Sequence, residues 1–181
     1  MAGLAMDESL VLRRFPTVAA LDYADHTLIP FDDRSYRWVS VKQFACDPVA
    51  SDESLLAALV AHWRYRDNYL SPDSHEHDTA TAHGPYRVAE ITPASFERIE
   101  PGQAAGVVEE FCGLDDSRSC RETRGQLQAL ALSPLSEAVC YRLRDLPHAI
   151  HEYGFALLEF RELVVIRREA AHIHLIVMAI D

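Results

Sequence analysis

The chain has 181 residues, a length typical of one domain, and it is 49% apolar and 25% charged, which excludes wholesale disorder. No apolar run approaches the roughly 20 residues that cross a bilayer, and the first ten residues carry acids where a secretion signal needs bases. We therefore expect a cytoplasmic protein, and the net charge of −11 disfavours nucleic-acid and anionic-membrane partners.

The first part of the chain predicts strands followed by one helix. Residues 9–22 contain short apolar runs on either side of Pro16, which fits a strand interrupted by a residue that cannot donate to a sheet. Residues 52–69 place apolar side chains at helical spacing behind a Ser51 cap, and Pro72 prevents the helix from continuing.

Between these segments, residues 34–46 predict a strand, because aromatic and β-branched residues are frequent in it. Successive side chains of a strand point to opposite faces. Tyr36, Trp38, Ser40 and Lys42 therefore share one face of the predicted strand.

The middle of the chain predicts a loop and then helices. The polar loop 71–85 is longer than a simple connection requires. After a short strand at 86–91, apolar side chains at helical spacing predict helices over 102–112 and 117–132. Gly113 is placed to end the first of these helices in the left-handed conformation.

The last third predicts strands over 138–143, 155–168 and 172–180. Residues 172–180 are apolar on both faces, which is typical of a central strand, and they form a β-hairpin with 155–168. Strands, then helices, then strands indicate an α+β fold. We predict a single domain over residues 1–181, with a mainly antiparallel sheet, about three helices and a C-terminal β-hairpin.

Acidic side chains gather in the middle of the chain. Residues 73–116 contain ten acids against two arginines, so this quarter holds eight of the eleven excess negative charges. One interpretation is a solvated acidic face that keeps the protein soluble, and the other is a surface that attracts a basic protein partner. The candidate interaction residues are Asp73, Glu76, Asp78, Glu109, Glu110, Asp115 and Asp116.

Histidines form a second candidate site. His172 and His174 share a face at the start of the last strand, about 6.5–7 Å apart, where they either ligate one metal ion or lie hydrogen-bonded at the rim of a core strand. In the polar loop, His75, His77 and His83 lie among carboxylates, a donor set that suits a divalent transition metal. The alternative for this group is a solvated loop.

His148 and His151 are three residues apart in the sequence. Together with Glu152 they would complete a metal site with the C-terminal pair if the sheet brought these residues together.

No sequence signature of catalysis is present, since nucleophile elbow, phosphate-binding loop and dinucleotide fingerprint are all missing. The four cysteines form no CxxC pair, and we expect reduced, mostly buried thiols. The residues leave open whether the chain is an enzyme.

Two hypotheses for the function follow. The first is a small acidic bacterial protein that docks on a basic protein partner and neutralises it, as immunity proteins do. The second is a metal-dependent enzyme or metal sensor that uses histidines of the loop or of the C-terminal pair. A homodimer is compatible with either hypothesis.

Overall fold

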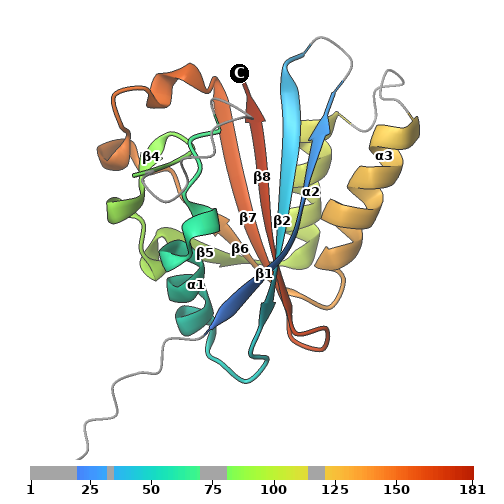
Figure 1. Cartoon of the computed structure of the whole chain (residues 1–181). Helices are drawn as coiled ribbons and strands as arrows, with labels where there is room; N and C mark the ends of the chain where they lie inside the picture. The colour runs from blue at the N-terminus through green and yellow to red at the C-terminus, as the bar shows by residue number, and fades with distance from the viewer. Residues whose placement is uncertain (1–19, 32–34, 70–80, 114–120) are drawn as a thin grey trace, which may run out of the picture.

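The computed structural model describes residues 20–31, 35–69, 81–113 and 121–181. They form an α+β fold around a six-stranded sheet, in the order β1-β2-β8-β7-β6-β5 (Figure 1). Every neighbouring pair in this sheet is antiparallel. The six strands are β1 (Leu21–Pro30), β2 (Arg37–Cys46), β5 (Phe96–Ile99), β6 (Val139–Leu143), β7 (Glu159–Arg167) and β8 (His172–Ile180).

Helices cover both faces of the sheet. Helix α1 (Asp52–Ala61) lies on one face, and α2 (Pro101–Cys112) and α3 (Arg121–Leu127) lie on the other (Figure 1). A two-stranded hairpin, β3 (Ala82–His83) and β4 (Tyr86–Arg87), pairs outside the main sheet. The predicted α+β class, antiparallel sheet and C-terminal β-hairpin are confirmed.

Strand β8 divides two hydrophobic cores. Its odd-numbered residues from Ile173 to Val177 pack in the core beneath α1, and Ile176 and Met178 pack in the core beneath α2 and α3. Both sets are fully buried, because β8 pairs with β2 on one side and β7 on the other. The prediction of a central strand over 172–180 is confirmed.

Strand β2 also places its side chains as the alternation predicts. Trp38 packs against the core beneath α1, while Val39 and Val41 lie in the core beneath α2 and α3. Lys42 therefore points to the α1 face of the sheet, where it is buried. Residues 9–19, the main part of the first predicted strand, lie outside the described residues; β1 begins at Leu21.

The helix predicted over 52–69 is shorter than expected. Ser51 caps α1, accepting a hydrogen bond from the Ser54 amide at 3.2 Å, but the helix ends at Ala61. His62 is extended (ψ 135°), and its Nδ1 accepts a hydrogen bond from the Arg64 amide at 3.1 Å. This local side-chain bond starts a separate 3-10 turn, η1 (Trp63–Tyr65), in place of further α-helix.

The two later helices agree with the sequence in position. Helix α2 ends at Gly113 in the left-handed conformation (φ 57°), as predicted. Helix α3 continues as a π-helical segment, η4 (Gln128–Leu132), and a 3-10 turn, η5 (Ser133–Leu135). The predicted start at 117 lies outside the described residues.

Two strand predictions need correction. The strand predicted over 86–91 stops at Arg87 and becomes a 3-10 turn, η2 (Val88–Glu90). The strand predicted over 155–168 begins only at Glu159, because a 3-10 turn, η7 (Gly154–Ala156), precedes it. A further 3-10 turn, η3 (Pro93–Ser95), leads into β5. The sequence did not predict the strand β5.

Among the described segments, no helix is long and apolar enough to span a membrane.

Candidate functional site

Acidic side chains gather at one end of the sheet, where β2 and β7 begin and β8 ends; we call it the upper end, as it lies in Figure 1. The last turn of α2 reaches this end, since the Arg37 side chain at the start of β2 donates to the Phe111 carbonyl at 2.8 Å. Glu109 and Glu110 of that turn are exposed. The other predicted interaction residues, Asp73, Glu76, Asp78, Asp115 and Asp116, lie outside the described residues.

Arg161 and Arg37, two arginines at the upper end, already bind protein groups. Arg161 donates to Glu159 at 2.5 Å and to Glu110 at 3.1 Å, and the hydrogen bond from Arg161 lowers the pKa of Glu110. Arg37 binds the hydroxyl of Ser35 and the end of α2. The side chain of Glu109, by contrast, makes no hydrogen bond or ion pair with a described residue and is exposed to solvent.

Large apolar side chains are exposed at the same end. The exposed fraction is 72% for Tyr36, 60% for Tyr153, 76% for Phe155 and 77% for Leu158, and Ile150 nearby is 46% exposed. We call these five side chains the apolar cluster. The Asp181 amide donates to Tyr36 and the Leu158 amide to Ile180, so Tyr36 and Leu158 flank the end of β8, about 10 Å apart by strand spacing.

The β3–β4 hairpin holds the segment 147–158 that carries most of the apolar cluster. The Pro85 carbonyl accepts from the His151 amide at 3.0 Å, and the Gly84 carbonyl accepts from the His151 ring at 2.9 Å. Arg87 donates to the carbonyls of Ile150 and His148 at 2.8 and 2.9 Å. The exposed apolar side chains therefore stand on a fixed backbone.

His83 anchors the inner side of this hairpin. Its ring is fully buried, stacked on Tyr65 with ring centroids 3.7 Å apart. Nδ1 donates to the Tyr65 carbonyl, which can only accept, and Nε2 is hydrogen-bonded to Glu162. The other Glu162 oxygen accepts from the Tyr65 hydroxyl at 3.0 Å, so both ring nitrogens and both carboxyl oxygens are satisfied.

Lys42 lies beside this group on the same face of the sheet. Its ammonium donates to the Arg64 carbonyl at 3.0 Å, to Asp67 at 2.8 Å and to the Tyr69 hydroxyl at 3.3 Å, which uses all three donors. Burial lowers the pKa of Lys42, while Asp67 opposes that shift. Burial alone would raise the pKa of Asp67, but the Lys42 charge lowers it below its usual value.

These buried groups hold structure together and offer no accessible chemistry. Lys42, His83 and Glu162 are all buried, and each finds its partners within the protein. Two of the described cysteines offer no nucleophile either, since burial raises the pKa of Cys112 to about 12 and that of Cys140 to about 11. A thiol with such a pKa is almost entirely protonated at neutral pH.

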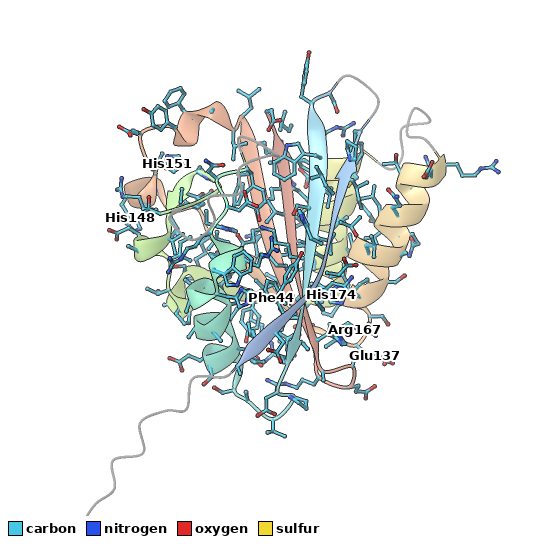
Figure 2. All side chains as sticks on the ribbon, in the orientation of Figure 1. Phe44, Glu137, His148, His151, Arg167 and His174 are labelled. Carbon is cyan, nitrogen blue, oxygen red and sulfur yellow. The ribbon has the colours of Figure 1, made fainter. Side chains whose placement is uncertain are left out.

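The predicted metal ligands do not converge among the described residues. No three His, Cys, Asp or Glu side chains in that part of the chain are placed to hold a metal ion. His148 and His151 lie near the hairpin, well away from His174 (Figure 2). His75 and His77 lie outside the described residues, so metal binding by them stays a prediction.

In the C-terminal histidine pair, His172 agrees with the expectation of a hydrogen-bonded residue at the rim of the strand, and His174 does not. His172 Nδ1 bonds the Ala170 carbonyl at 2.5 Å at the strand's start. His174 is only 6% exposed, and its Nδ1 has no hydrogen-bond partner among the described residues. It lies between Gln43 and Val165 on neighbouring strands, so it is an interior residue and not a rim residue.

This burial predicts an acid-sensitive fold. Burial, then the charge of Arg167 and the proximity of His172, lowers the pKa of His174 from 6.5 to about 4. The unfolded chain therefore binds an extra proton between these values, and the free energy of unfolding falls by about 3 kcal/mol as the pH drops from above 6.5 to 4. We expect His174→Leu to flatten this loss in urea unfolding measured from pH 7.5 to 4.5.

His148→Leu is the matched control, because His148 is exposed. It should leave the pH dependence of wild type unchanged. His26 and His62, whose pKa values are also lowered by burial, leave a residual slope in the His174 variant. Equal slopes for wild type and His174→Leu would contradict the assignment.

Comparisons with known proteins add little. No known protein family matches the sequence, and no curated protein matches it either. Two crystal forms of citrus MAF1 are similar in structure: one aligns with 83% of this chain and 92% of MAF1 at 10% identity and a TM-score of 0.45. The other aligns with 83% of this chain and 93% of MAF1 at 12% identity and a TM-score of 0.39. No conclusion about this protein rests on these likenesses.

Proposed function

We propose that this chain is a binding protein that docks on a basic protein partner through the upper end of its sheet. The observation that carries the proposal is the set of exposed acids there, next to two arginines that are already bonded within the protein. Glu109, Glu152 and Asp181 are exposed at this end. Acidic surfaces of this kind accelerate encounter with basic partners.

The position of Glu109 and Glu110 supports the proposal. Both lie in the last turn of α2, which contains no basic residue, although the negative end of a helix dipole disfavours acids there. Residues that oppose a local preference are commonly retained for function. Glu110 is compensated by Arg161, whereas Glu109 is not.

A pair of charge reversals tests where a basic partner docks. The probe is a labelled 20-residue peptide of lysine and serine at low salt. Glu109→Lys with Glu152→Lys should slow its association about 3–10-fold, because the reversals act at the docking surface. Glu109→Lys should not destabilise the fold, since a cation suits the C-terminal turn of a helix.

The control reverses two exposed acids at the opposite, lower end of the sheet, Glu53→Lys with Glu169→Lys. The net charge is then identical in both double variants, so any difference in the association rate reports the location of the charge. We expect less than about a 2-fold change for the control. Equal slowing by both variants would show a response to net charge alone and would overturn the proposal.

A further inference from the structure

We infer that the apolar cluster is the centre of the docking surface, and that the partner presents basic side chains around an apolar patch of its own. This inference rests on the proposed function, since it assumes that the acids of the upper end receive a basic protein. It goes further by assigning the contact residues and the chemistry of the partner. The contact residues are Tyr36, Ile150, Tyr153, Phe155 and Leu158.

The distribution of exposed apolar side chains is the first argument. Eight large apolar side chains are exposed among the described residues, and five of them form the apolar cluster. Single exposed apolar residues are ordinary on any protein surface, whereas a gathered group marks a site of interaction. Three of the five, Tyr153, Phe155 and Leu158, lie close together in the sequence.

The second argument is that the backbone beneath the cluster is fixed. Arg87 and the Pro85 carbonyl bind residues 148–151, and the Leu158 amide bonds to the end of β8 at 2.9 Å. A partner would therefore meet the side chains already in place and would not have to order the loop. Rigid aromatic anchors surrounded by polar residues are the usual centres of binding energy.

The negative charge of the upper end favours a different partner over a second copy of this chain. Acids surround the cluster: Glu152 and Glu159 border residues 153–158, and Asp181 lies beside Tyr36. Two copies docked through this end would bring their acids together, and like charges across an interface oppose association. A partner with lysine or arginine around an apolar centre matches both features.

Three peptides of 20 residues each test this inference by titration calorimetry: one of lysine and leucine, one of lysine and serine, and one of glutamate and leucine. We expect wild type to bind the lysine–leucine peptide at least 10-fold more tightly than the lysine–serine peptide. Phe155→Ala with Leu158→Ala should remove that difference and leave the affinity for the lysine–serine peptide unchanged. This variant should unfold at the wild-type urea concentration, because both side chains are exposed.

Val49→Ala is the matched control, since Val49 is 87% exposed at the lower end of the sheet, and it should bind all three peptides as wild type does. The inference is overturned if the double variant keeps the preference for the lysine–leucine peptide. It is also overturned if the glutamate–leucine peptide binds equally well, or if wild type forms a dimer that the double variant does not. Failure of wild type to bind either lysine peptide would instead overturn the proposed function.

Discussion

Replacing Glu162 by alanine is expected to lower the free energy of unfolding by about 3–5 kcal/mol, the usual cost of removing one partner of a buried ion pair. The carboxyl group is hydrogen-bonded to the His83 ring and accepts from the Tyr65 hydroxyl in a buried site. Its loss leaves the imidazole nitrogen and the phenol hydroxyl without partners inside the core. Urea unfolding followed by circular dichroism at pH 7 measures the change.

Glu162→Gln is the informative companion to this variant. Its amide keeps the shape of the carboxyl group, accepts from the Tyr65 hydroxyl and donates to a neutral His83 ring. It should therefore cost clearly less than alanine. Glu169→Ala, an exposed residue in the β7–β8 turn, should change stability by less than about 0.5 kcal/mol, and an equally small effect of Glu162→Ala would contradict the described network.

Replacing Gly84 by alanine is the second large effect that we expect, at about 2–4 kcal/mol. Gly84 has φ +51°, a conformation that costs other residues about 1–2 kcal/mol. A Cβ there would also lie 2.5 Å from Cζ and 2.7 Å from Cδ2 of the Phe160 ring, which adds the cost of overpacking. The hairpin would have to move away from both the sheet and His151.

Two variants separate the causes of this loss. Gly106→Ala, in an open position of α2, should stabilise the protein by about 0.5–1 kcal/mol, as alanine usually does in a helix. Phe160→Leu should recover part of the loss when combined with Gly84→Ala, because the smaller side chain makes room for the methyl group. If Gly84→Ala did not lower the free energy of unfolding, that result would contradict the close contact between the hairpin and Phe160 of the sheet.

The regular elements could be predicted because their patterns are local. The alternation in β2 placed Trp38 and Lys42 on one face, and the apolar character of β8 on both faces identified a central strand. Gly113 marked the end of α2 correctly. Each of these inferences needs only the period of a strand or the conformation of one glycine.

The pairing of the buried polar side chains could not be predicted, because the partners come from distant parts of the chain. His83 and Glu162 are 79 residues apart, and His83 lies in a segment whose polar composition indicates a solvated loop. Lys42 was the available signal, because a lysine that shares the face of a strand with Trp38 and Phe44 implies a buried partner. The identity of that partner, Asp67, required the fold.

The apolar cluster was hidden for a different reason. Phe155 and Leu158 continue the apolar pattern of β7, so the sequence assigned them to the strand predicted over 155–168. In the structure the Ala156 amide bonds to the Tyr153 carbonyl at 3.1 Å, and this turn buries Leu157 while exposing Phe155 and Leu158. Which side of an apolar stretch faces water is decided by the elements packed around it.

The central claim is that the upper end of the sheet is a docking surface for a basic, partly apolar partner. Mapping amide chemical shifts while the lysine–leucine peptide is added to the full chain tests it most directly. We predict the largest changes at residues 150–158, at Tyr36 and Arg37, and at Glu109 and Glu110. Changes centred on the lower end, at residues 47–53 and 168–170, would contradict the account.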